Sequence, residues 1–367
     1  METIILKFGG TSVGSTDRIF AVANIIKAAC DEASPVVVVS AMSGETNRLI
    51  ELANSFGNEP NKREFDALVS TGERVSASLV AIALNQLGLK AKSLSAAQIG
   101  MKTTANFSRA KIIDLDKEVI FKTIEDGYIP IITGFQGITS DGDTTTMGRG
   151  GSDTTAVAIA ASIQSKRCDI YTDVDGIYTT DPKIVSNAKK LDSITMEEML
   201  ELAGQGAKVM QTRAVEFANK YKVAVRVLSS FNEGSGTLIS LEDNGMENSL
   251  VSGIAFQKDQ VKVTLHGVED TPGTAFKILG PISDAEIEVD VIVQNVSVDG
   301  KTDFTFTVSN EDQEIVKKIV EDVRQKIEFK DLIIDSDIAK VSLVGVGMRS
   351  QSGVASRTFK VYLTLLL

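Results

Sequence analysis

The chain has 367 residues, which at about 150 residues per domain indicates two or three domains. Its 38 Lys and Arg residues against 49 Asp and Glu residues give a net charge of −11. Proteins that bind nucleic acids usually carry a basic face, so this balance argues against a nucleic acid as the main partner. Hydrophobic residues make up 43 % of the chain, which is enough to bury several cores and argues against disorder.

The small numbers of cysteine and histidine residues exclude further classes of protein. Cys30 and Cys168 are too few for a disulfide framework. The one histidine, His266, excludes a His-rich zinc site and argues against a Ser-His-Asp triad. The longest apolar runs are too short to span a bilayer, and the first residues lack the pattern of a secretory signal. We therefore expect a cytoplasmic protein.

Strand-like and helix-like segments alternate through residues 1–245. Apolar runs predict β strands at residues 3–8, 36–40, 128–133, 168–172 and 223–228. Apolar stripes with the helical period predict a helix capped by Ser15 or Thr16 and further helices at residues 64–87, 154–163, 196–203 and 209–221. This alternation predicts a mainly parallel sheet with helices on both faces.

An internal repeat follows a polar stretch at residues 242–245. Residues 262–268 (KVTLHGV) match residues 340–346 (KVSLVGV), and a glycine opens a helix-like stretch after each copy. The first copy continues with strands at residues 287–293 and 303–308, a helix at 311–327 and a strand near 332–334. This order predicts a ferredoxin-like unit, whereas the second copy reaches only its first strand and helix.

The segment KFGGTS at residues 7–12 joins the first strand to the first helix. Gly9 and Gly10 let the backbone approach a ligand, and successive N–H groups there form a nest for anions. The following helix N-terminus and Lys7 favour phosphate oxygens. The alternative is a tight turn with a solvated lysine, and this segment alone does not separate the two interpretations.

A long polar loop at residues 133–155 contains Arg149 among glycines. A loop of this length is typical of a functional segment. Arg149 can hold a carboxylate with two hydrogen bonds or neutralise a phosphate. The alternative is that Ser152 and Asp153 only cap the next helix, but capping does not explain Gly148, Gly150 and Gly151.

Three further segments carry polar side chains that allow two interpretations. Residues 171–183 follow a strand, and their carboxylates could hold Mg²⁺ or a ribose while Tyr178 meets a base; the alternative is a polar turn. Glu73 interrupts an apolar stripe, where a charge is usually solvated or paired. Lys208 follows a glycine turn and either points at phosphate or lies on the surface.

These segments together resemble aspartokinase, the ATP-dependent kinase of the aspartate side chain. The resemblance covers nearly the whole chain in order: residues 7–13, 39–43, 70–74, 148–153, 171–178 and 206–209, then 271–273, 291–296 and 344–350 in a tail that resembles paired ACT domains. It implies an α/β three-layer amino-acid-kinase sandwich with a mainly parallel sheet, followed by ferredoxin-like ACT units. We expect a catalytic domain at 1–245, an ACT domain at 246–334 and a partial second one at 335–367.

The resemblance also implies residue roles. Lys7 would bridge the transferring phosphoryl group, Asp153 would orient the reacting groups, Arg149 would hold the substrate α-carboxylate and Glu73 its amino group. The nucleotide would contact Lys7, Phe8, Gly9, Gly10, Ser40, Thr172, Asp173, Tyr178, Asp181, Pro182, Lys183 and Lys208. The substrate would contact Thr46, Glu73, Arg149, Gly150, Gly151, Ser152 and Asp153. An effector amino acid would bind at Asp270, Thr271, Pro272, Gly273, Thr274, Ala275, Gln294 and Asn295.

The implied reaction is transfer of the γ-phosphoryl group of ATP, with Mg²⁺, to L-aspartate, the first step towards lysine, threonine and methionine. The resemblance further implies a homo-oligomer built through ACT units, with lysine or threonine as effector. We expect no nucleic-acid or membrane partner and no metal ligands from the protein. The rival hypothesis is a non-catalytic amino-acid sensor that keeps the kinase fold. Two departures from the family are Gln211-Thr212, where many relatives have His-Pro, and the residues after Phe359.

Overall fold

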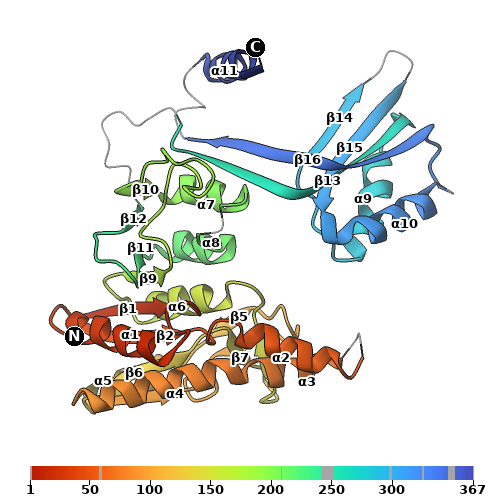
Figure 1. Ribbon diagram of the computed structural model, residues 1–367. Coiled ribbons are helices and arrows are strands. Elements are labelled where there is room, and N and C mark those ends of the chain that lie inside the picture. The colour runs from red at the N-terminus through yellow and green to blue at the C-terminus, as the bar shows by residue number, and fades with distance from the viewer. Residues whose placement is uncertain are drawn as a thin grey trace. The chain divides into compact units, whose positions relative to one another are not determined.

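The computed structural model describes residues 2–57, 60–207, 209–241, 251–296, 300–324, 326–345 and 352–366. The chain divides into two compact units (Figure 1). One unit consists of Met1–Ile254 and Leu343–Leu367, and the other of Ala255–Ser342. The functional site predicted from the sequence falls in the first unit and the predicted effector loop in the second.

Eight strands form the central sheet of the first unit, in the order β10-β12-β11-β9-β1-β2-β6-β3. All neighbours are parallel except β11 and β12. The predicted mainly parallel sheet is therefore confirmed. The strands are β1 Thr3–Phe8, β2 Ser34–Val39, β3 Ala91–Leu94, β6 Ile129–Thr133, β9 Cys168–Thr172, β10 Ser193–Thr195, β11 Val225–Ser229 and β12 Thr237–Ser240.

Helices cover both faces of this sheet, as expected. Helices α1 (Thr16–Ala29) and α4 (Thr71–Gln86) share a core with Ile4, Leu6 and Phe8 of β1, while α6 (Gly151–Ser162) lies on the other side of β1 (Figure 1). Side chains alternate along a strand, so Lys7 points to the α6 side. The other helices of this unit are α2 Glu45–Asn54, α3 Lys62–Val69, α5 Lys117–Glu125, α7 Met196–Gly204, α8 Thr212–Tyr221 and α11 Val354–Leu366.

A second, small sheet of this unit has the order β5-β4-β7-β8. Its strands are β4 Lys102–Thr103, β5 Ile112–Asp114, β7 Gln136–Ile138 and β8 Thr144–Thr146. Strand β8 ends five residues before α6 begins. The Arg149 loop is therefore held between this small sheet and the helix that packs on the main sheet.

One predicted helix is divided in two. The segment expected as a single helix at residues 64–87 is α3 and α4, which are separated at Ser70. The carbonyl of Ser70 accepts a hydrogen bond of 2.8 Å from the side chain of Gln136, which occupies an acceptor at the junction. By length and composition alone, the stretch Lys62–Gln86 is apolar enough to cross a membrane, yet 56 % of its most apolar window is buried inside the protein.

The second unit has a four-stranded sheet in the order β14-β15-β13-β16. Helices α9 and α10 pack with it around a core that includes Val263, Phe306 and Val320. This order matches the ferredoxin-like fold predicted from the repeat. The elements are β13 Gly253–Glu269, α9 Thr274–Asp284, β14 Ile292–Val296, β15 Lys301–Ser309, α10 Gln313–Val323 and β16 Asp331–Val344. Strand β16 continues through residue 335, so the predicted boundary between ACT units falls inside a strand.

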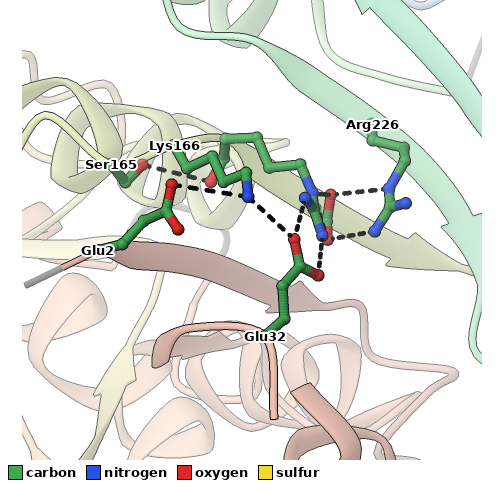
Figure 2. Close-up of polar contacts among 7 residues, drawn as sticks. Glu2, Glu32, Ser165, Lys166 and Arg226 are labelled. Atoms are coloured by element: carbon green, nitrogen blue, oxygen red, sulfur yellow. Dashed lines mark hydrogen bonds and ion pairs between the residues drawn. The ribbon is translucent and has the colours of Figure 1, made fainter. Parts of the chain in front are cut away.

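A charged cluster crosses the sheet face that carries α1 (Figure 2). Asp169 of β9 is only 1 % exposed and accepts hydrogen bonds from Arg167 (2.9 and 3.1 Å) and from Arg226 of β11 (3.0 and 2.7 Å). Arg167 also contacts both oxygens of Glu32, at 2.5 and 2.6 Å. The hydrogen bond from Arg167 lowers the pKa of Glu32 to about 2. The cluster ties β9 to β11 and to the turn after α1.

Candidate active site

A pocket of about 480 Å³ opens at the ends of β1, β2 and β9. This is the edge at which parallel sheets of this kind usually bind ligands. Thirteen of the residues that the sequence analysis expected in the site line the pocket: Lys7, Gly9, Gly10, Ser40, Thr46, Glu73, Arg149, Gly150, Gly151, Ser152, Asp153, Thr172 and Asp173. The structure thus brings together segments that lie far apart in the sequence.

The turn after β1 forms one wall of the pocket. The N–H group of Ser43 donates to the carbonyl of Gly10 at 3.1 Å. A Cβ atom at Gly10 would lie 2.8 Å from the carbonyl oxygen of Ala41, so any side chain there would push the two loops apart. Lys7 enters the same wall and forms an ion pair of 2.5 Å with Asp153 of α6.

Asp153 and Ser152 do not cap their helix. Helix α6 begins at Gly151, with Gly150 as its N-cap residue and no side-chain hydrogen bond at the cap. The alternative interpretation of the two residues as helix caps is therefore wrong. Their positions within the first turn place them at the positive end of the helix dipole. The same helix start can favour an anionic ligand in the pocket.

Glu73 is a buried carboxylate that also lines the pocket. It is 3 % exposed and lies in the first turn of α4. Its Oε1 atom accepts a hydrogen bond of 3.0 Å from the N–H group of Ala41, whereas Oε2 is buried without a hydrogen-bond partner in the described part of the chain. Burial raises the pKa of Glu73 to about 7. An ammonium group of a ligand would supply the missing donor and favour the ionised form.

Arg149 lies at the mouth of the pocket on a loop with left-handed glycines. Gly148 has φ +76° and Gly150 has φ +68°. The Arg149 side chain is exposed, and no hydrogen bond or ion pair joins it to another described residue. An unpaired guanidinium beside a pocket is available for a carboxylate or a phosphate, which it can hold with two hydrogen bonds.

Five of the predicted nucleotide contacts are not among the residues that line the pocket: Phe8, Tyr178, Asp181, Pro182 and Lys183. The ring of Phe8 is fully buried on the other face of the sheet and stacks on Tyr171, with 4.8 Å between ring centroids. Tyr178 donates to Asp175 at 2.8 Å, and the Asp181 side chain accepts from the N–H group of Lys183 at 2.8 Å. Those bonds fit the polar turn that was the alternative interpretation. Pro182 and Lys183 lie in the same turn, and Lys208 lies outside the described residues.

Several pocket residues were not selected from the sequence. They are Thr11, Ala41, Met42, Ser43, Gly44, Phe135, Val209, Met210 and Gln211. Residues 41–43 stood inside a recognised segment but carried no charge to mark them. Phe135 has φ +68°, which is uncommon for a residue with a side chain, and this strain is not visible in its sequence neighbourhood.

The predicted effector loop of the second unit is assembled from two segments. Gln294 of β14 donates to Asp270 at 3.2 Å. Thr271 and Thr274 share a hydrogen bond of 3.0 Å, and Gly273, with φ +90°, is the N-cap residue of α9. The carbonyl of Asn295 accepts from Thr302. Pro272 and Ala275 complete the loop. The contacts bring together the two segments that the sequence analysis joined.

The chain is similar to known kinases along almost its whole length. Residues 2–229 match the amino acid kinase family, and residues 263–328 match the ACT domain. The aspartate kinase of Pseudomonas fluorescens is 53 % identical over 364 residues, which cover 98 % of this chain and 88 % of the relative.

Solved structures show the same similarity. Aspartokinase III of E. coli in complex with aspartate and ADP (R-state) has a TM-score of 0.84 at 27 % identity, with 98 % of this chain and 91 % of that chain covered. The same enzyme in complex with lysine and aspartate (T-state) has a TM-score of 0.76 at 26 % identity, with 98 % and 91 % covered.

Proposed function

The chain belongs to the amino acid kinase family and, within it, to the aspartokinases, and on that premise we propose how its pocket works. An aspartokinase transfers the γ-phosphoryl group of ATP to the side-chain carboxylate of L-aspartate, and the products are ADP and 4-phospho-L-aspartate. We assign the amino-acid substrate to Arg149 and Glu73. Lys7 and Asp153 lie at the transferred phosphoryl group.

The observation that carries this assignment is a pair of unsatisfied charged groups in one pocket. Among the described residues, Arg149 offers a guanidinium without a partner, and Glu73 offers a buried oxygen that lacks a donor. An α-amino acid carries the complementary pair, a carboxylate and an ammonium. A buried acceptor without a donor is costly, so the substrate ammonium restores a hydrogen bond that the free protein lacks.

Phosphoryl transfer to a carboxylate requires that the reactants be positioned and that their charge be neutralised. The aspartate side chain is already ionised near neutral pH, so its attack on phosphorus needs no general base. Lys7, the N–H groups of the turn after β1 and the start of α6 stabilise the charge that spreads over the phosphoryl oxygens. A catalytic histidine is therefore not required.

Mg²⁺ would bind chiefly through the nucleotide. Among the described residues, no group of three or more His, Cys, Asp or Glu side chains is placed to hold a metal ion. Mg²⁺ usually keeps one or two carboxylates together with substrate phosphates and waters. Asp173, which lines the pocket, can supply such a carboxylate, and the ion would neutralise charge on the phosphates.

A coupled assay of ADP release tests the proposal. L-Aspartate should produce ADP at a rate that saturates with its concentration, whereas L-glutamate, one methylene longer, should be a poor substrate. The rival hypothesis of an amino-acid sensor without catalysis predicts aspartate binding in calorimetry but no ADP above the background rate. The second result would overturn the assignment of Lys7 and Asp153.

The second unit supports a regulatory role. ACT sequence at residues 263–328 and the loop at residues 270–275 with Gln294 favour an amino-acid effector. We propose lysine or threonine as that effector, and the E. coli relative solved in complex with lysine supports the first of the two. We also propose that the chain forms a homo-oligomer through its ACT units. As domains we propose a catalytic domain at 1–245, an ACT domain at 246–334 and a partial ACT domain at 335–367.

A further inference from the structure

The Arg149 loop depends on side chains outside the pocket. Arg149 itself has no hydrogen bond or ion pair to another residue in the described part of the chain, and glycines stand on both sides of it. Yet a bidentate contact with a substrate carboxylate requires that the loop be held in place. Two charged side chains, the buried Asp66 and the partly buried Arg213, bind the backbone just before the loop, at Thr146 and Met147.

Asp66 of α3 binds this backbone from one side. It is 0 % exposed. Its carboxylate accepts hydrogen bonds from the N–H group and hydroxyl of Thr146, at 2.6 and 2.9 Å, and from the N–H group and hydroxyl of Ser108, at 2.8 and 2.9 Å. A buried carboxylate is tolerated when donors satisfy it. Asp66 therefore fastens two loop segments to α3.

Arg213 of α8 binds the same two segments from their carbonyl side. Its guanidinium donates to Met147 at 3.2 Å and to Ala110 at 2.9 Å. Burial lowers the pKa of Arg213, and Glu216 opposes this change. The N–H group of Ala110 also donates a hydrogen bond of 2.9 Å to the carbonyl of Thr146, which joins the two segments to each other.

Asp66 and Arg213 each lie close in sequence to a residue that lines the pocket. Asp66 lies seven positions before Glu73, and α4 follows α3 after one residue. Arg213 lies two positions after Gln211, which lines the pocket. A Cβ atom at Gly150 would lie 1.8 Å from the Gln211 side chain. The Arg149 loop is thus fastened to the helix pair that presents Glu73 and to the segment that contains Gln211.

We propose that Asp66 and Arg213 are positioning residues that set the distance between Arg149 and Glu73 and thereby determine affinity for the amino-acid substrate. This inference rests on the proposed function. It adds two side chains that contact neither substrate nor nucleotide. Their hydrogen bonds act on the backbone of residues 146–147, and Arg149 carries the effect into the pocket.

Kinetics of Arg213→Met, Arg213→Lys and Lys220→Met test the proposal. Lys220 is an exposed cation on the same helix and serves as the matched control. Arg213→Met should raise KM for aspartate about 10- to 100-fold, because a small misplacement of a binding group is costly. KM for ATP should change by less than about twofold. Arg213→Lys, which retains a donor for one carbonyl, should fall between Arg213→Met and the wild type.

A double-mutant cycle separates positioning from general destabilisation. In an Arg149→Ala background, Arg213→Met should change KM for aspartate by less than about twofold, because the group through which it acts is gone. Independent, multiplying effects of the two substitutions would overturn the proposal. So would an unchanged KM for aspartate in Arg213→Met, or equal rises in both KM values. Asp66→Asn, if it folds, should behave as Arg213→Met does.

Amide hydrogen exchange supplies a readout that does not need catalysis. Residues 146–151 should exchange faster in Arg213→Met than in the wild type, whereas Lys220→Met should leave them unchanged. A wild-type protein without aspartate-dependent ADP release would overturn the proposed function. In that case unchanged exchange at residues 146–151 in Arg213→Met would overturn the positioning role as well, and faster exchange there would support it.

Discussion

The Nζ atom of Lys7 lies 2.5 Å from Oδ1 of Asp153, and both side chains are close to 90 % buried. The contact has the distance of an ion pair, but Oδ1 has no partner of hydrogen-bond geometry among the described residues. Lys7 is therefore held in the pocket by its ion pair with Asp153. Because an ammonium group has three N–H donors, Lys7 can bind a phosphoryl oxygen while it keeps its contact with Asp153.

Lys7→Ala should lower kcat more than it raises KM for aspartate. Lys7 meets charge that grows on the transferring phosphoryl group, and loss of such a contact lowers the rate about 10²- to 10³-fold. Steady-state kinetics with saturating ATP measure the effect. Thermal unfolding serves as a check, because the substitution leaves Asp153 buried without its cation. A folded variant with near wild-type kcat would exclude the role.

Arg149→Ala should mainly raise KM for aspartate. A carboxylate contact present in both ground and transition states contributes to binding and much less to kcat. The measurement is KM for each substrate in turn. If KM for ATP rises while KM for aspartate stays constant, Arg149 is a phosphate ligand and the assigned substrate orientation is wrong.

KM for aspartate should fall as pH rises through the pKa of Glu73, about 7 in the free protein. Only the ionised carboxylate attracts the substrate ammonium, so KM should fall about tenfold between pH 6 and pH 8. Glu73→Gln should abolish this dependence and raise KM throughout. A wild-type KM that is flat over this range would contradict the assignment.

The same group makes a stability prediction with a definite sign. Burial raises the pKa of Glu73 above its ordinary value of 4.5, so folding favours the protonated carboxyl. Its contribution is complete below about pH 4.5 and is lost as pH rises towards 7. The free energy of unfolding should therefore fall across this window relative to that of Glu73→Gln, as urea titrations at several pH values would show.

Gly150→Ala should weaken aspartate binding and destabilise the fold by about 1–3 kcal/mol. Gly150 has φ +68°, and an added Cβ would lie 1.8 Å from Gln211. Gly127→Ala is the matched control, because Gly127 has φ +79° but no atom within 4 Å of an added Cβ. The control should lose stability and keep its KM for aspartate. A normal KM in Gly150→Ala would show that the loop tolerates displacement.

Asp169→Asn should lower the free energy of unfolding by about 3–5 kcal/mol, since it leaves two guanidinium groups without their buried carboxylate. Glu2→Gln, in the same cluster (Figure 2), is the control. The Glu2 side chain is 58 % exposed and lies 3.6 Å from Lys166, so its loss should cost less than about 1 kcal/mol. Urea denaturation of both variants measures the difference, and equal losses would contradict the argument.

Local sequence patterns were sufficient to predict most of the helices and strands. The run at residues 168–172 is β9 without change, and Ser15 accepts the capping hydrogen bond of α1. Period and capping chemistry act within a few residues, so a local pattern contains them. The stretch predicted as one helix at 64–87 is interrupted at Ser70, whose carbonyl accepts a hydrogen bond from Gln136, a residue 66 positions away.

The sequence by itself determined which charged side chains could serve an amino acid and a phosphate. Lys7 and Arg149 were selected from their glycine-rich surroundings, Glu73 and Asp153 from the family resemblance, and all four line one pocket. Chemical type and neighbouring glycines are local properties. For the same reason the family resemblance could be recognised from short segments in order.

Only the tertiary structure decided what each of these groups contacts and what holds it. Burial raises the pKa of Glu73, and the hydrogen bond from the N–H group of Ala41, 32 positions away, opposes that shift. Asp66 and Arg213, which lie 147 positions apart in the sequence, meet at the same two backbone segments. Burial and long-range hydrogen bonds depend on which strands become neighbours, and that is settled only when the whole sheet is assembled.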